Sequence, residues 1–286
     1  MRISRRTLMA NAAALSSLAA ACQTPADAPC CAASDALGDL DATGVAAHIR
    51  AGRISAQEAL DAAIARAERV NPQLNFIATP AYNYARARLS QRLEGPFAGV
   101  PTLIKDLMPM TGVPTKYGSR AFANNVPTEQ PPYMDALIAA GLVPFGKSAT
   151  PEFGLTATTE PLLGGATRNP WDTSRSSGGS SGGAAAAVAA RVVPIAHASD
   201  GGGSIRIPAS CNGLVGLKPS RGRSVLGGRP DSGVDISVNG CVSRSVRDTA
   251  AWLAVTEQTG AGATFPPIGV VTGPSTQRLR IRLDVP

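Results

Sequence analysis

The sequence predicts an α/β fold, a β-sheet covered by helices on both faces. Two apolar runs, Gly99–Asp106 and Val192–Ala196, have the length and composition of buried strands. Segments of helical character accompany them: Ser55–Val70 carries apolar residues at helical spacing, and Ala184–Ala190 is almost all alanine. Strands that alternate with helices favour a sheet packed between helical layers. With 286 residues, 44% hydrophobic and 16% charged, the chain is typical of a globular protein.

The first 22 residues have the features of an export signal, with a basic start, a short apolar stretch and small residues. Arg5 and Arg6, within SRRTLM, resemble a twin-arginine signal, and Leu18–Cys22 resembles a lipoprotein cleavage box whose leucine lies one position early. Lipidation of Cys22 and ordinary cleavage nearby both stay open. Residues 23–36 are predicted to be a tether. We therefore expect an exported protein, either periplasmic or anchored to the membrane as a lipoprotein.

Residues 37–286 are predicted to form one domain, which turns helical from Thr43. Ser55 and Glu58 have the spacing of a capping box, which starts the first long helix. Asn71-Pro72 is expected to end that helix, and Tyr84–Leu93 to form another. Further along, Leu137–Gly146 is predicted to be a helix end, a turn and a strand.

Lys105 ends the apolar run Gly99–Asp106, which suggests that its side chain is buried. The alternative is a lysine whose stem follows the apolar surface while its amine reaches water. Near the end of the chain, Ile268–Val271 is predicted to be a strand, and Arg278–Leu283 to be a strand or a frayed terminus.

Two glycine–serine loops, Gly178–Gly183 and Gly201–Ser204, bracket the alanine-rich helix and the second apolar run. Flexible linkers have this composition, but these loops lie at the ends of packed elements, where functional sites are usually built. Phosphate binding has little support, because no lysine follows Gly183 and because Arg206 stands where a dinucleotide fingerprint needs its third glycine.

Acyl transfer fits the second loop better. Ser204 follows three glycines, whose backbone N–H groups could converge on one oxygen, as an oxyanion hole requires. A serine nucleophile needs a base. His197, near Asp200, could complete a Ser–His–Asp triad, although a buried structural histidine is the simpler interpretation; a lysine or a second serine is the other choice.

GGSSGG, followed by SDGGGSIRIPAS and preceded by GVPTLIKD, resembles the amidase-signature hydrolases, and the resemblance extends from about Gly44 to Arg282. It implies a Ser–Ser–Lys triad in which Ser204 is the nucleophile, Ser180 the bridging serine after a cis peptide bond, and Lys105 the base. It also implies a mixed, twisted sheet. The loop Thr158–Trp171, together with PIAHASDGGGS, resembles the branch with 6-aminohexanoate cyclic-dimer hydrolase.

The resemblance gives roles to the residues around the triad. The backbone N–H groups of Gly201, Gly202, Gly203 and Ser204 are expected to hold the oxyanion. An Asp200–Arg206 pair is expected to shape the loop, with Ser181 in the same network.

The expected function is hydrolysis of a linear or cyclic non-peptide carboxamide, or an ester. Family members continue past Pro286, so the domain is expected to lack its usual C-terminal part. The alternatives are a non-catalytic exported remnant and a subunit resembling the glutamyl-tRNA amidotransferase amidase; export argues against the second.

Charge and cysteine content limit the partners. The formal charge is +7, but the basic residues are scattered, so nucleic-acid binding has weak support. The cysteines match no zinc pattern, and Cys211 and Cys241 are predicted to be buried thiols. We expect no metal and no cofactor, a small-molecule amide as partner, and membrane attachment only through a lipidated Cys22. Disulfide pairing, oligomeric state and substrate identity stay open.

Overall fold

The structure, a computed structural model, describes residues 35–225 and 236–273. Its helices are α2 (Ala42–Arg50), α3 (Ala56–Leu74), α4 (Tyr82–Leu89), α5 (Pro132–Ala139), α6 (Gly182–Ala189), α7 (Arg206–Asn212) and α8 (Val246–Thr256), with 3₁₀ turns at Arg120–Phe122 and Glu152–Gly154. Its strands are β1 (Ile77–Pro80), β2 (Pro101–Lys105), β3 (Val143–Ser148), β4 (Arg168–Asn169), β5 (Asp172–Ser176), β6 (Ile195–Asp200), β7 (Val215–Gly216) and β8 (Val238–Ser243).

Two three-stranded sheets, in the orders β1-β3-β2 and β6-β8-β7, meet where β2 lies beside β6. β2 and β3 run parallel, whereas the other pairs in these sheets are antiparallel. Side chains join the two sheets: Thr102 Oγ1 donates to the Ile195 carbonyl at 2.9 Å, and the Lys105 N–H group donates to His197 Nδ1 at 3.2 Å. The predicted mixed strand pairing is therefore present in the β1-β3-β2 sheet, although the strands form two adjacent sheets and not the single sheet that was expected.

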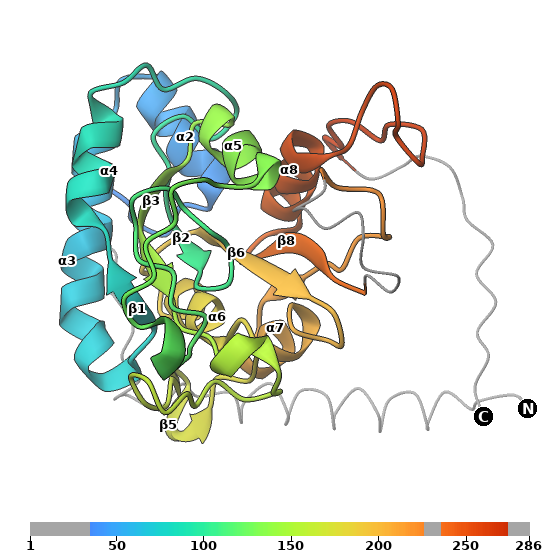
Figure 1. Cartoon of the computed structure of the whole chain (residues 1–286). Coiled ribbons are helices and arrows are strands. Elements are labelled where there is room, and N and C mark those ends of the chain that lie inside the picture. The colour runs from blue at the N-terminus through green and yellow to red at the C-terminus, as the bar shows by residue number, and fades with distance from the viewer. Residues whose placement is uncertain (1–34, 226–235, 274–286) are drawn as a thin grey trace, which may run out of the picture.

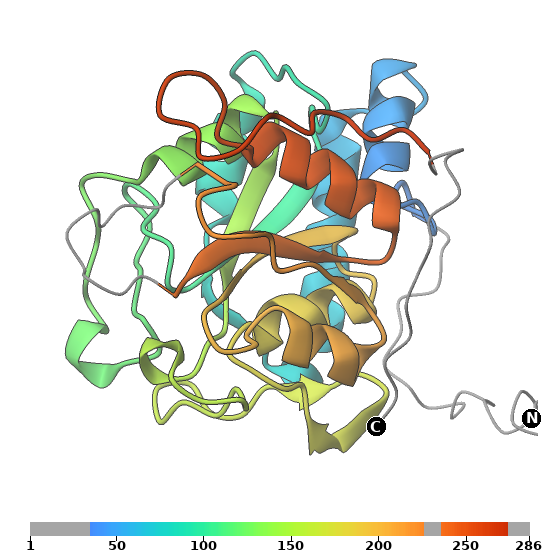
Figure 2. The ribbon, with the colours of Figure 1, turned by 90° about the vertical axis from the view of Figure 1, so that its right-hand side faces the viewer.

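Helices cover the sheets on both sides, as Figures 1 and 2 show, with α5 and α8 on one side and α6 and α7 on the other. α6 is buried over all but its last residue, because its alanine side chains let it pack closely against β6 and β2. On the opposite side, Trp252 Nε1 donates to Tyr133 Oη at 2.9 Å and ties α8 to α5. The predicted α/β architecture is confirmed.

The first long helix begins as predicted and ends later. Ser55 and Glu58 make both halves of the capping box. Asn71-Pro72 does not end α3, which continues through Pro72 to Leu74, and the Asn75 N–H group still donates to the Asn71 carbonyl at 2.8 Å. The last helical residue is Leu74, and Asn75 caps the helix in a left-handed conformation with φ of 53°. The next helix, α4, runs a few residues earlier than the predicted Tyr84–Leu93.

Two strand predictions need correction. The strand expected at Val192–Ala196 is β6, which begins at Ile195 and continues to Asp200, so His197 lies inside the strand. Ile268–Val271 is not a strand and is largely exposed. There the Ile268 and Gly269 N–H groups donate to the Glu257 carboxylate instead of to a neighbouring strand.

The two cysteines of the described residues differ. Both are free thiols; Cys241 is buried, as predicted, whereas Cys211 is exposed on α7. The export signal, nearly all of the tether and Arg278–Leu283 lie outside the described residues. Within the described ranges, no helix combines the length and the apolar character that crossing a bilayer requires.

Candidate active site

Lys105 is the last residue of β2, and its side chain is fully buried. Its Nζ atom lies 2.7 Å from Ser180 Oγ, 3.0 Å from Ser199 Oγ and 3.4 Å from the Ser199 carbonyl oxygen. Each of these partners is uncharged. Burial lowers the pKa of Lys105 to about 7, against an opposing effect of the Asp200 carboxylate. Lys105 is therefore partly neutral near pH 7 and can act as a base.

Ser180 is brought to this amine by the first glycine–serine loop, in which the Gly179–Ser180 peptide bond is cis. The loop glycines permit close packing: a Cβ on Gly179 would lie 2.5 Å from the Thr158 carbonyl oxygen, and one on Gly183 would lie 2.3 Å from the Ala149 nitrogen. The loop then continues directly into α6. The glycines thus serve main-chain packing around Ser180.

Ser204 lies beside this loop, because its carbonyl oxygen accepts a hydrogen bond from the Ser181 N–H group at 3.3 Å. Within the described part of the chain, its hydroxyl makes no hydrogen bond. The structure therefore gathers Lys105, Ser180 and Ser204 from three separate segments. Only the lysine and Ser180 are joined by a hydrogen bond.

Asp200 organises the loop that carries Ser204. Its buried carboxylate accepts from the Gly203 N–H at 2.8 Å and the Ile205 N–H at 3.1 Å, and it pairs with Arg206 Nε at 2.9 Å. Burial alone would raise the pKa of Asp200, but these hydrogen bonds outweigh burial and lower it. The expected Asp200–Arg206 pair is thus present and fixes the loop.

The predicted oxyanion donors are not equivalent. The Gly203 N–H group is committed to Asp200, so in this structure it is not available to an oxyanion, contrary to the sequence-based expectation. Among the described residues, the N–H groups of Gly201, Gly202 and Ser204 have no acceptor. These three are the remaining candidates.

His197 is buried inside β6, and neither of its ring hydrogen bonds is to Ser180 or Ser204. Its Nδ1 atom accepts from the Lys105 main chain, and its Nε2 atom lies 3.2 Å from Asn239 Oδ1. Burial lowers the pKa of His197 to about 3, although the hydrogen bond to Asn239 acts in the opposite direction. The ring is therefore neutral near pH 7, and both nitrogens are occupied, so it has the contacts of a structural histidine.

A second buried lysine, Lys147 on β3, was not singled out from the sequence. Its Nζ atom lies 3.8 Å from Asp106 Oδ1, donates to Thr115 Oγ1 at 2.9 Å, and contacts the Met108 carbonyl. Burial lowers the pKa of Lys147 to about 8, while Asp106 opposes this. The burial of Lys147 could have been predicted from the apolar run that leads into it, which is the same pattern that indicated a buried Lys105.

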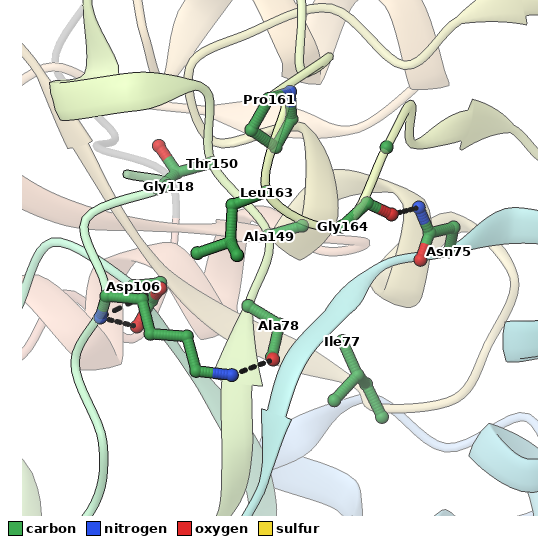
Figure 3. Close-up of a pocket in the computed structure, with 12 residues that line it drawn as sticks. Asn75, Ile77, Ala78, Asp106, Gly118, Ala149, Thr150, Pro161, Leu163 and Gly164 are labelled. Atoms are coloured by element: carbon green, nitrogen blue, oxygen red, sulfur yellow. Dashed lines mark hydrogen bonds between the residues drawn. The ribbon is translucent and has the colours of Figure 1, made fainter. Parts of the chain in front are cut away.

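A cavity of about 120 Å³ lies between β1 and the loops that follow β2 and β3 (Figure 3). Asp106 and Thr150 line it, and Asn75 closes one end by donating to the Gly164 carbonyl at 2.7 Å. None of the three triad residues lines this cavity. It therefore does not place a substrate carbonyl at Ser204. In the described ranges, no cluster of side chains has the composition of a metal site.

Comparison with known proteins assigns the family. Residues 58–269 match the family model described as Amidase. The chain belongs to the amidase family. The match confirms the resemblance seen in the glycine–serine motifs.

The relatives are about twice as long as the matched region. The chain is 50% identical over 251 residues to a Mycobacterium leprae protein with the provisional name amidase AmiC, covering 86% of this chain and 53% of that protein. It is 45% identical over 231 residues to 6-aminohexanoate-cyclic-dimer hydrolase of Paenarthrobacter ureafaciens, covering 79% and 47%. The solved structure of a 6-aminohexanoate cyclic dimer hydrolase aligns with a TM-score of 0.74 and 42% identity, covering 82% and 50%. This chain thus spans about half the length of the curated relatives that it matches.

Proposed function

We propose that the protein hydrolyses a carboxamide by acyl transfer to Ser204, with Ser180 and Lys105 as the proton relay. The observation that carries the proposal is the 2.7 Å hydrogen bond between the buried Lys105 amine and Ser180 Oγ. A lysine with a pKa of about 7 is suited to this task, because a base is most effective when its pKa lies near the working pH.

Acylation would begin with neutral Lys105. Ser204 Oγ attacks the carbonyl carbon and gives its proton to Ser180 Oγ, while Ser180 gives its own proton to Lys105 Nζ. The carbonyl oxygen becomes an oxyanion, held by the N–H groups of Gly201, Gly202 and Ser204. When the tetrahedral intermediate collapses, the C–N bond breaks, and the amine takes a proton from Ser180 that Lys105 replaces.

Deacylation would repeat these steps with water in place of the serine hydroxyl. Water adds to the acyl carbon and loses a proton through Ser180 to Lys105. The bond to Ser204 Oγ then breaks, and the proton returns to Ser204. The products are a carboxylic acid and an amine, and the enzyme regains its starting state.

The residues around the triad would position it. Asp200 and Arg206 keep the loop that carries Ser204 in shape, and Asp200 draws the Gly203 N–H group inward. Ser181 connects both loops, because its N–H group donates to the Ser204 carbonyl and its hydroxyl lies 3.3 Å from the Ser199 carbonyl.

The substrate class we propose is a small non-peptide amide, linear or cyclic, with esters as a further option. Similarity to 6-aminohexanoate-cyclic-dimer hydrolase supports cyclic amides, and 40% identity over 227 residues to an acylamidase of Rhodococcus erythropolis supports acyl amides.

The test is the hydrolysis profile of the purified chain across linear amides, cyclic amides and p-nitrophenyl esters, beside a Ser204→Ala variant. The proposal predicts hydrolysis by the wild-type chain only, with an acyl adduct on Ser204 detected by mass spectrometry of rapidly quenched samples. A folded wild-type chain that hydrolyses none of these substrates and forms no adduct would contradict it and favour a non-catalytic remnant.

We also propose that the protein is exported through its twin-arginine signal and is then either periplasmic or held at the membrane by a lipidated Cys22. Fractionation of cells that express the full chain, Arg5→Lys/Arg6→Lys and Cys22→Ala tests both parts. Export that survives the double substitution would exclude the twin-arginine route, and membrane association that survives Cys22→Ala would exclude the lipid anchor.

A further inference from the structure

Ser199 contacts the Lys105 amine twice but was not singled out from the sequence. We propose that Ser199 is a positioning residue that occupies the N–H groups of Lys105 and leaves its lone pair directed at Ser180. This inference rests on the proposed function, and it adds a residue outside the predicted triad.

The number of contacts carries the argument. A neutral lysine amine has two N–H donors and one lone pair, whereas an ammonium group has three donors. Lys105 Nζ has three polar neighbours: the Ser199 carbonyl, Ser199 Oγ and Ser180 Oγ. The carbonyl oxygen can only accept. If Ser199 Oγ accepts the second N–H group, the lone pair is left for the nearest neighbour, the Ser180 hydroxyl at 2.7 Å.

The same three neighbours also suit the protonated lysine. After the proton moves from Ser180 to Lys105, the ammonium has three donors and three oxygen acceptors at the same positions. No side chain has to rearrange during the transfer, and such prearranged polar groups are the usual basis of electrostatic catalysis.

Ser199 is itself held in place. Its N–H group donates to Ser181 Oγ at 3.3 Å, and the Ser181 hydroxyl can donate to the Ser199 carbonyl at the same distance. Ser199 also lies in β6, directly opposite Asn239 of β8. The acceptors for Lys105 are therefore fixed by the sheet and by the residue next to Ser180.

Ser148 offers a matched control. It lies on β3 opposite Lys105 in the parallel register, it is fully buried like the lysine, and its hydroxyl has no hydrogen-bond partner among the described residues. Ser148→Ala therefore removes a buried hydroxyl beside the same strand without removing a contact to the amine.

The experiment compares Ser199→Ala, Ser199→Thr and Ser148→Ala in the full chain. We expect Ser199→Ala to lower kcat by about 10–100-fold, the loss typical of a hydrogen bond to a charged group, with KM little changed. The rising part of its plot of rate against pH should move to lower pH, because the ammonium form of Lys105 loses a hydrogen-bond acceptor. Ser199→Thr, which keeps the hydroxyl, should restore kcat and the position of the pH profile. Ser148→Ala should leave both unchanged.

A readout without turnover separates this inference from the proposed function. NMR titration of lysine labelled with ¹⁵N at the side-chain nitrogen gives the pKa of Lys105 directly, with Lys105→Met identifying its signal. The inference predicts a lower pKa in Ser199→Ala and the wild-type pKa in Ser199→Thr, even if no substrate is found. An unchanged pKa in Ser199→Ala would overturn it. A higher kcat in Ser199→Ala would also overturn it, because Ser199 would then be competing for the lone pair.

Discussion

Lys105 and Lys147 occupy neighbouring strands, and both are buried at the end of an apolar run. Burial lowers the pKa of each, to about 7 and about 8. Their surroundings differ, however. Lys147 faces the Asp106 carboxylate at 3.8 Å, whereas every hydrogen-bond partner of the Lys105 amine is a hydroxyl or a carbonyl.

We propose that this difference makes Lys147 a structural cation and Lys105 a base. A carboxylate beside a buried ammonium favours the charged form, so Asp106 opposes the lowering of the Lys147 pKa by burial. Asp106 also accepts from the Lys116 N–H group at 3.2 Å. An amine with only neutral partners loses its proton more easily, so it can accept one from Ser180. The proposed roles of the two lysines therefore differ because of the groups that their amines contact.

The largest expected effect is on turnover at Lys105. Lys105→Ala should lower kcat by on the order of 10⁴ or more, as losing one member of a nucleophilic unit does in other enzymes. The fold should survive, because the change removes a buried amine that has no carboxylate in hydrogen-bond contact. Steady-state kinetics together with a melting curve measure both. A folded Lys105→Ala chain with near-normal turnover would assign the base elsewhere.

Lys147→Met should show the opposite pattern, with its main effect on stability. It leaves the buried Asp106 carboxylate without its cation, which costs about 3–5 kcal/mol in comparable pairs. Urea unfolding measures this loss. Adding Asp106→Asn to the same chain should recover part of it, because the uncompensated charge is removed. If Lys147→Met keeps full stability but loses turnover, the proposed division between the two lysines is wrong.

His197 should matter for stability at low pH and little for turnover. Its pKa is lowered to about 3 in the folded chain, below the usual value of about 6.5. The unfolded chain therefore binds more protons between these pH values, so His197 makes the fold less stable as pH falls from about 6.5 toward 3. His197→Ala should weaken this pH dependence in urea unfolding and lower kcat by only a modest factor. An inactive but folded His197→Ala chain would favour a histidine base.

The smallest effect is expected at Arg206, whose side chain is 52% exposed. Arg206→Gln removes one partner of Asp200, but the Gly203 and Ile205 N–H groups continue to hold the carboxylate. Solvent around the exposed guanidinium screens its attraction to the Asp200 carboxylate. Stability and kcat should therefore change little, whereas Asp200→Asn should reduce kcat more strongly. Equal losses of kcat in Arg206→Gln and Asp200→Asn would mean that the Arg206 guanidinium does more than support the loop.

Much of the fold and the site could be predicted, because both depend on local patterns. The capping box at Ser55, the strand that ends at Lys105 and the alanine helix follow from spacing and composition. The glycine–serine motifs pointed to Ser180, which the structure places against the Lys105 amine, and to Ser204, which lies beside the loop that carries Ser180.

The rest depended on tertiary contacts that spacing does not encode. Apolar runs lead into both lysines, and only the fold shows that the Asp106 side chain lies beside the Lys147 amine. Ser199 precedes Asp200 without a distinctive pattern, and its role depends on a neighbouring strand. The run Ile268–Val271 was apolar enough for a strand, but the Glu257 carboxylate accepts hydrogen bonds from two of its N–H groups.

The central claim is that neutral Lys105 is the base, and the pH dependence of kcat/KM tests it most directly. The measurement uses the wild-type chain and an amide substrate that does not ionise between pH 5 and 10. Because burial lowers the pKa of Lys105 to about 7, the rate should rise tenfold per pH unit below 7 and hold level above it. Ser148→Ala should give the same curve. A rate that climbs until about pH 10, or one that falls again above pH 8, would contradict the account.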